Sequence, residues 1–195
     1  MRLGRSALIL AAVVLTTVVA VPPAQAKGGG PNKLPRTHSW DGNCSVEGLV
    51  HFDPPATVFQ QLLAVTYDAT GTCTGQLDGQ AVSSAPVAMH NFVYSSGSCL
   101  YAQTTGPGDG VLTFQDGPSI SYTFEFTYVG TDGVQTFRGK QSGSAIGHGS
   151  FLTPNSSPDA AAGCYNGEGV SEILMDISPL VTQTPLVSPS RRRSG

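Results

Sequence analysis

A ten-residue segment in the middle of the chain leaves little choice of secondary structure. In residues 120–129 (ISYTFEFTYV), apolar or aromatic side chains alternate with mostly polar ones, and β-branched and aromatic residues dominate. A repeat of two residues is typical of a β-strand with one buried and one exposed face, whereas an amphipathic helix repeats about every 3.6 residues. We therefore expect a strand whose buried face consists of Ile120, Tyr122, Phe124, Phe126 and Tyr128.

Similar short segments occur along most of the chain, separated by turn residues. Asp-Gly pairs suit turns because both residues tolerate left-handed backbone conformations. They occur five times, at 41–42, 78–79, 109–110, 116–117 and 132–133. About nine or ten short strands at this spacing predict an all-β fold, a single antiparallel sandwich or barrel. The other strands expected are 45–52, 86–94, 99–104, 111–114, 134–138, 145–151 and 170–177.

Residues 57–67 are open to two interpretations. Thr57 and Gln60 are spaced as in a helix-capping box, and apolar residues follow them at helical spacing. The same residues also alternate as in a strand, and Val65-Thr66-Tyr67 has strong β-forming chemistry. We favour the strand and keep the helix as the alternative.

The first 26 residues have the features of a cleavable signal peptide. Arg2 and Arg5 precede an uncharged run of 15 residues, 7–21, and Ala24-Gln25-Ala26 supplies a small-x-small cleavage site. The run is shorter than the roughly 20 residues that span a bilayer. We predict that residues 1–26 are removed during export and that the mature protein is secreted and extracellular, with no membrane span.

Composition divides the remaining 169 of the 195 residues into one domain and two tails. Residues 27–39 hold three glycines, two prolines and three basic side chains, and residues 179–195 hold three prolines and no periodic pattern. Neither segment is expected to bury enough apolar surface to offset the entropy lost on ordering. The sequence thus predicts a flexible N-terminal segment at 27–39, an all-β domain at 40–178 and a disordered C-terminal tail at 179–195.

The charge of the predicted domain is strongly negative. Residues 40–178 contain all thirteen acidic residues and only two basic ones, Arg138 and Lys140, so their formal charge is −11. This argues against binding of nucleic acid, which needs a basic face. The basic tails, including Arg191–Arg193, could contact an anionic polymer or surface, although short terminal charge runs mostly keep a chain end solvated.

The cysteine count predicts two disulfides. An even number of cysteines in an exported chain indicates disulfides, and no C-x-x-C spacing favours zinc. Four cysteines allow three connectivities. We expect Cys44–Cys73, because a hairpin of 45–52 and 58–68 that turns at 53–55 would place these two cysteines at its open end. The second bridge would then join Cys99 to Cys164 and tie the late part of the domain to its middle.

No recognised catalytic motif is present in the sequence. It lacks a G-x-S-x-G elbow and the Gly-Asp-Ser-Gly run of trypsin-like proteases, and Gly147–Ser150 is interpreted as a flexible turn. Sugar sites usually carry several aromatic platforms, whereas this chain has one tryptophan, Trp40, which is expected at the edge of the fold. The carboxylates available to a glycosidase are Glu47, Glu125, Glu168 and Glu172. We assign no catalytic, cofactor or metal residue. Calcium binding at the Asp-Gly loops stays open because these loops offer many carboxylates, although no EF-hand run occurs.

Several motifs resemble those of a known group of proteins. They are 69–75 (ATGTCTG), Ser98-Cys99, 110–114 (GVLTF) and 142–147 (SGSAIG). Over about residues 44–165 the chain is similar to small secreted β-rich proteins of actinobacteria, which are functionally uncharacterised. Because the shared positions are turns and cysteines, the resemblance implies the fold and the disulfides and transfers no active site.

Three functional hypotheses follow from these observations. The leading one is an exported non-catalytic β-domain that binds a surface, a polymer of the cell wall or a protein partner through its loops. The second is a β-barrel that carries a small apolar ligand against the aromatic residues of 120–129. The third is a small secreted hydrolase with an unrecognised site.

Overall fold

The computed structural model describes residues 36–151 and 163–190, and the predicted signal peptide lies outside them. Within these residues, helix is confined to one turn at 163–166. The rest is dominated by nine strands: β1 (Thr37–Ala56), β2 (Gln61–Leu77), β3 (Gln80–Gly97), β4 (Tyr101–Thr104), β5 (Gly108–Phe114), β6 (Ser119–Val129), β7 (Asp132–Gly139), β8 (Ser142–Phe151) and β9 (Val170–Pro189). The all-β prediction is confirmed, and residues 61–67 are strand rather than helix.

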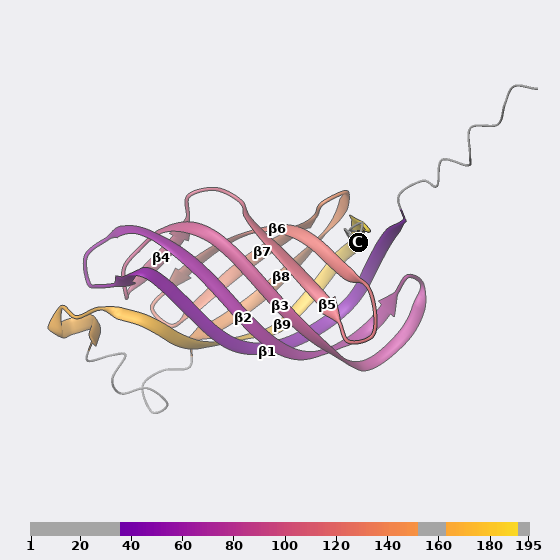
Figure 1. Cartoon of the computed structure of the whole chain (residues 1–195), viewed down its shortest axis with the longest axis horizontal. Helices are drawn as coiled ribbons and strands as arrows, with labels where there is room; N and C mark the ends of the chain where they lie inside the picture. Colours follow the sequence, from indigo (N-terminus) through magenta and orange to yellow (C-terminus); the bar gives the residue numbers. More distant parts are fainter. Residues whose placement is uncertain (1–35, 152–162, 191–195) are drawn as a thin grey trace, which may run out of the picture. The chain divides into compact units, whose positions relative to one another are not determined.

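The nine strands form one antiparallel sheet that closes on itself (Figure 1). Apart from β4 and β5, strands that follow one another in the chain are paired around the wall, and β1 and β9, the first and last, also pair. The short strands β4 and β5 share one place, both lying between β3 and β6. Of the two predicted architectures, this closed pairing is that of a barrel, which leaves no unpaired sheet edge.

The core lies inside the closed sheet. In β6 the predicted apolar face points inward: Ile120, Tyr122, Phe124 and Tyr128 are buried, and Phe126 is partly buried against them. Trp40, expected at the edge of the fold, is instead fully buried, and its ring lies 5.0 Å from that of Phe114. It is the first inward residue of a strand that begins earlier than predicted, at Thr37.

The predicted disordered tail is wrong for residues 179–189, which form the second half of β9. This half pairs with β1 on one side and with β8 on the other. Leu180, Leu186 and Ser188 point inward and are at most 2 % exposed. The register on β1 shifts between the segments paired with Leu180 and with Leu186, and such irregularities break the two-residue repeat that marks a strand in sequence. Residues 191–195 and 27–35 of the predicted tails lie outside the described residues.

The turn between β1 and β2 also lies later than predicted. It spans residues 57–60, and β1 continues through the expected turn at 53–55 to Ala56. A register shift between β1 and β9 accommodates this segment, since proline cannot donate a backbone hydrogen bond. The hydroxyl of Thr57 accepts a hydrogen bond from the amide of Phe59 at 3.2 Å, so the polar pattern that suggested a helix cap stabilises a turn instead.

Not all Asp-Gly pairs form turns. Pairs 78–79 and 116–117 lie in turns between strands, whereas 41–42 and 109–110 lie inside β1 and β5 and 132–133 begins β7. Gly110 shows the reason: a Cβ at this position would overlap the ring of Tyr122 and the side-chain oxygen of Asn91. Glycine is needed there for close packing inside the barrel rather than for chain reversal.

Candidate functional site

The two disulfides join Cys44 to Cys73 and Cys99 to Cys164, which is the predicted pairing. Cys44 and Cys73 are direct partners in the β1–β2 register, with a Cα–Cα distance of 4.1 Å, and both are buried. Cys99 lies in the loop after β3, and Cys164 lies in the helical turn before β9, with their Cα atoms 6.0 Å apart. The second disulfide therefore fastens the segment before β9 to one end of the barrel.

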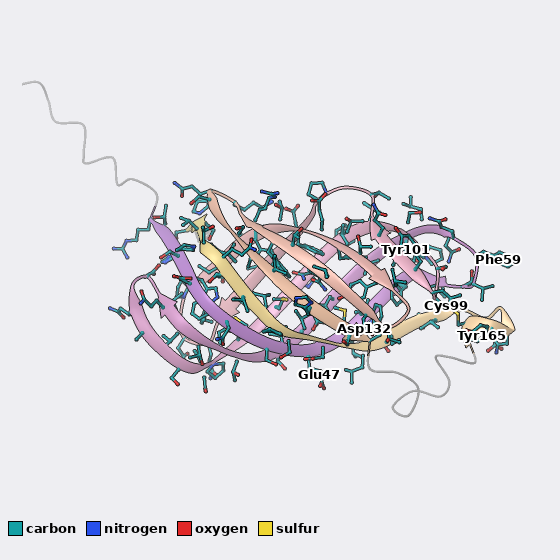
Figure 2. The ribbon with its side chains drawn as sticks, turned by 180° about the vertical axis from the view of Figure 1, so that it is seen from behind. Glu47, Phe59, Cys99, Tyr101, Asp132 and Tyr165 are labelled. Carbon is teal, nitrogen blue, oxygen red and sulfur yellow. A yellow bond between two sulfur atoms is a disulfide. The ribbon has the colours of Figure 1, made fainter. Side chains whose placement is uncertain are left out.

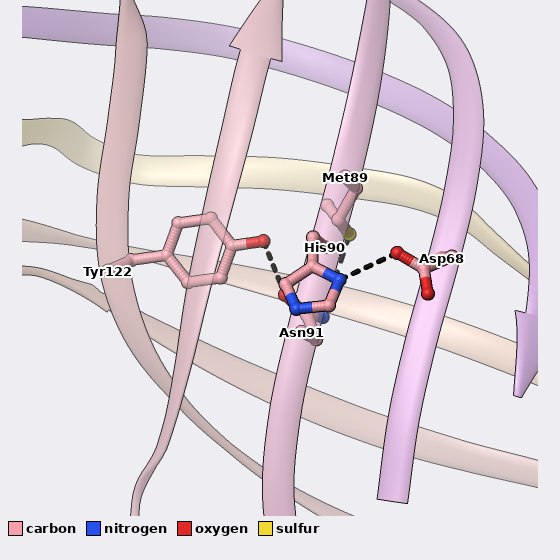
Figure 3. A network of polar contacts seen from close by, with 5 residues as sticks. All are labelled: Asp68, Met89, His90, Asn91 and Tyr122. Carbon is pink, nitrogen blue, oxygen red and sulfur yellow. Dashed lines mark hydrogen bonds and ion pairs between the residues drawn. The ribbon is translucent and has the colours of Figure 1, made fainter. Parts of the chain in front are cut away.

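Three of the four histidines pair with a carboxylate on a neighbouring strand or in a turn. Nδ1 of His90 lies 2.6 Å from Asp68, that of His51 lies 2.9 Å from Glu172, and that of His38 lies 2.7 Å from Asp78. The His90 and Asp68 pair is shown in Figure 3 on neighbouring strands. Among the described residues, no serine, threonine or cysteine side chain completes any of these pairs into a nucleophile–base arrangement. The His90–Asp68 and His51–Glu172 pairs are cross-strand contacts of a kind that stabilises sheets, and the His38–Asp78 pair joins β1 to the turn after β2.

The carboxylates proposed for a glycosidase are spread around the sheet. Glu47 lies in β1, Glu125 in β6, Glu168 before β9 and Glu172 in β9, where it pairs with His51. Glu47 faces Asp176 across the β1–β9 register. Partial burial raises the pKa of the Asp176 carboxyl. Residues Gly147–Ser150, which were predicted to be a flexible turn, are instead part of strand β8.

Polar side chains inside the barrel form a small hydrogen-bonded cluster. The hydroxyl of Tyr122 donates to Asn91 Oδ1 at 2.7 Å, and Gln135 Nε2 donates to the hydroxyl of Tyr128 at 2.7 Å. The hydroxyl of Tyr67 lies within 3.4 Å of two backbone carbonyls. Desolvation raises the pKa of all three phenols, that of Tyr128 to about 12. The cluster is therefore neutral at ordinary pH.

The space left beside this cluster is very small. A cavity of about 20 Å³ remains among mainly apolar side chains that include Phe52, Phe124 and Phe126. This is about the room that one water molecule needs, whereas sites for drug-sized ligands measure roughly 300–1,000 Å³. The inward face of β6, a candidate ligand surface, is packed as core.

The outer wall carries an unexpected group of aromatic and apolar side chains. We call Leu62 on β2, Phe92 and Tyr94 on β3, and Tyr101 on β4 the aromatic face. Leu62 is 61 % exposed and Tyr94 is 54 % exposed. The rings of Phe92 and Tyr94 contact edge to face, with their centroids 5.4 Å apart. The strand pairings that join β2 to β3 and β3 to β4 bring these four residues onto one wall.

Uncharged polar side chains lie among the rings. Ser96 stands opposite Leu62 on one side and Gln103 on the other in the sheet register. Gln60 Nε2 donates to Ser96 Oγ at 2.9 Å, and the hydroxyl of Tyr101 donates to Gln103 Oε1. We call Gln60, Ser96 and Gln103 the polar strip. Its amides and hydroxyls are partly or fully exposed and can bond to a ligand.

Loops at the adjoining end of the barrel extend this exposed surface. Phe59, Leu100 and Tyr165 are each more than half exposed, and Figure 2 shows Phe59, Tyr101 and Tyr165 gathered near Cys99 at one end. The Cys99 amide donates to Thr57 O at 2.8 Å, so the loop after β3 is held to the turn after β1. The exposed side chains thus project from loops that are cross-braced.

Sequence reasoning missed the aromatic face because the two sides of β3 are equally apolar. Residues 86–94 were expected to be a strand. Val87, Met89 and Val93 lie on one side of it and Phe92 and Tyr94 on the other, so the sequence does not indicate which side faces inward. The polar residue Asn91 faces inward, where it meets Tyr122 (Figure 3). The phase of the strand was therefore decided by a partner far away in the chain.

No family model, curated protein or solved structure matches the chain. The likeness to secreted actinobacterial proteins thus stays a prediction.

Two further properties concern the described residues. In residues 36–151 and 163–190, no three side chains of histidine, cysteine, aspartate or glutamate are grouped so that they could hold a metal ion. The same ranges contain no helix long and apolar enough to cross a membrane.

Proposed function

We propose that this chain is an exported, non-catalytic binding domain, and that the aromatic face is its binding surface. The observation that carries the proposal is the exposure of Leu62, Phe92, Tyr94 and Tyr101 on one wall of a closed, disulfide-braced barrel. Exposed apolar side chains that gather in one patch mark interaction sites far more often than scattered ones. The occupant would be an extracellular surface, polymer or protein.

The rigidity of the scaffold supports this proposal. The backbone carbonyl of Tyr94 accepts hydrogen bonds from both the amide and the hydroxyl of Thr105, at 3.0 and 3.1 Å. Tyr94 and Phe92 also restrict one another through their ring contact. Side chains that are ordered before binding lose little conformational entropy when a ligand arrives.

The location of the exposed rings favours outer binding over carriage of a ligand inside the barrel. The interior cavity beside β6 measures only about 20 Å³, so the side chains around it would have to unpack before an apolar ligand could enter there. The outer wall needs no such rearrangement. Native mass spectrometry of the protein as secreted would detect a carried small molecule, and its presence would favour the carrier hypothesis.

The test is retention of the mature protein by material from its own culture, including the cell-wall fraction. We expect retention to fall at least tenfold in the double variant Leu62→Ser, Tyr94→Ser. Leu49→Ser and Val181→Ser change side chains that are 41 % and 42 % exposed on β1 and β9, outside the aromatic face, and serve as controls. Equal retention of all variants would show that the aromatic face is not the binding surface.

A further inference from the structure

We propose that the aromatic face binds a neutral polysaccharide. This inference rests on the proposed function, because it names the class of ligand for the same surface. Three features carry it: the exposed rings, the uncharged polar strip among them, and the negative charge of the rest of the domain.

The exposed rings match the apolar faces of sugar rings. Phe92, Tyr94 and Tyr101 are 39 %, 54 % and 37 % exposed, so part of each ring can be covered by a ligand. An aromatic ring has a negative face, and the C–H groups of a pyranose ring, which are slightly positive, pack against such a face. Burial of these surfaces from water adds a favourable hydrophobic contribution.

The polar strip matches the hydroxyl groups at the edges of the same sugars. Gln60, Ser96 and Gln103 together offer amide donors, amide acceptors and a hydroxyl beside the rings. Two of their hydrogen bonds, Gln60 to Ser96 and Tyr101 to Gln103, already hold these groups in place. Sugar hydroxyls both donate and accept hydrogen bonds, so they can bond to such a mixed set of groups.

Charge favours a neutral polymer over a charged one. None of the seven residues of the aromatic face and polar strip carries a carboxylate, amine, guanidinium or imidazole. The next outward residue along β3 is His90, and it is paired with Asp68. The domain as a whole has a formal charge of −11 over residues 40–178, which repels polyanions. The carboxylate of Asp109 stands opposite Phe92 on β5, at the border of the face, and it is paired with Lys140.

The pattern of the surface favours a polysaccharide over a protein partner. The centre of a protein interface is usually a continuous apolar patch from which polar groups are displaced to the rim. Here Ser96 lies between Leu62 and Gln103 in the middle of the face, so polar and apolar groups alternate. Such alternation suits a ligand whose own rings alternate C–H faces with hydroxyl edges.

The test is affinity electrophoresis of the mature protein through gels that contain one polysaccharide each. The neutral probes are amylopectin, mixed-linkage β-glucan, galactomannan and arabinoxylan, and the anionic probe is polygalacturonate. We expect a neutral probe, and not polygalacturonate, to retard the protein. Tyr94→Ala and Tyr101→Ala should weaken that retardation at least tenfold, whereas Tyr94→Phe should keep most of it because the ring remains. Leu49→Ala, outside the face, should have no effect.

A second measurement separates this inference from the proposed function. The native cell-wall fraction is treated either with periodate, which cleaves sugar diols, or with a protease, before the mature protein is added. Retention that depends on Tyr94 and is lost after periodate supports a polysaccharide. Retention that depends on Tyr94 but is lost only after protease overturns this inference and leaves the proposed function standing. Absence of any Tyr94-dependent retention, in gels and on the wall fraction, overturns both.

Discussion

The side chains that face the barrel interior show how polar groups are tolerated in a core. Asn91 is only 2 % exposed, and its side-chain oxygen accepts a hydrogen bond from the buried hydroxyl of Tyr122. A buried polar group without a partner costs about 1–3 kcal/mol, so each group of such a pair depends on the other. This pair also joins β3 to β6 over Gly110 of β5, which lies between the two strands (Figure 3).

Replacing Tyr122 by phenylalanine tests this dependence. We expect Tyr122→Phe to lower the free energy of unfolding by about 1–3 kcal/mol, because Asn91 Oδ1 loses its donor while the ring is kept. Urea unfolding followed by circular dichroism measures the change. The matched control is Tyr94→Phe, which removes a hydroxyl from a residue that is 54 % exposed and should change stability by less than about 0.5 kcal/mol. Equal losses in the two variants would contradict this account.

At the scale of single elements, β9 illustrates how a proline-containing segment becomes an ordered strand. Its second half satisfies its backbone groups on two sides, with β1 and with β8. Leu180 and Leu186 are buried at 2 % exposure each, which adds hydrophobic stabilisation. The bulges in its register give the prolines room without leaving an unpaired sheet edge.

Two neighbouring positions in β9 test whether this half-strand belongs to the core. Leu180→Ala should lower the free energy of unfolding by about 2–5 kcal/mol, the usual cost of a cavity at a buried leucine. Val181→Ala, at a side chain that is 42 % exposed, should cost less than about 1 kcal/mol. The measurement is chemical denaturation of both variants beside the wild-type protein. If Leu180→Ala were as stable as Val181→Ala, this half of β9 would not be part of the packed barrel.

The glycine at position 110 of β5 tests the close packing of neighbouring strands. Gly110→Ala should destabilise the protein by about 1–3 kcal/mol or more, since its Cβ would overlap the Tyr122 ring and Asn91. Gly106 provides the matched control, because a Cβ there would meet no atom within 4 Å. The unfolding temperatures of the two alanine variants should therefore differ clearly, and that of Gly106→Ala should be close to the wild-type value. A wild-type transition for Gly110→Ala would rule out the tight contact.

At the scale of the whole molecule, the buried phenols make stability depend on alkaline pH. Burial raises the pKa of Tyr67, Tyr122 and Tyr128 above the ordinary value of 10.0, that of Tyr128 to about 12. Between these values the folded protein holds protons that the unfolded chain has released. The free energy of unfolding therefore falls as pH rises in this range, by about 3 kcal/mol for Tyr128 once its folded pKa is passed.

Urea unfolding at about pH 8, 10 and 11 measures this dependence. We expect the tyrosine side chains to leave the free energy of unfolding unchanged below about pH 10 and to lower it steadily above that pH. Phenolate absorbance should report the buried tyrosines only as the protein unfolds. Tyr128→Phe should make the decline shallower, although it also removes the hydrogen bond from Gln135. A stability that rose between pH 10 and 11 would contradict the assignment.

Local patterns in the sequence were sufficient for most of the strands and for the disulfide pairing. The two-residue alternation of 120–129 placed both the strand and its inward face correctly, because alternation depends only on neighbouring residues. The pairing of Cys44 with Cys73 followed from a hairpin between consecutive strands, although its turn lies at 57–60 rather than at 53–55. The candidate binding surface could not be predicted, because both sides of 86–94 are apolar.

The closure of the sheet, the order of residues 179–189 and the outward direction of Phe92 and Tyr94 were decided only by tertiary structure. Each depends on hydrogen bonds or packing between residues far apart in the chain, such as Asn91 with Tyr122 and β1 with β9. The second half of β9, whose register is interrupted and whose prolines donate no hydrogen bond, shows no periodic pattern of its own. It is ordered because β1 and β8 offer it backbone partners and the barrel offers its apolar side chains an interior, and neither can be read from the local sequence.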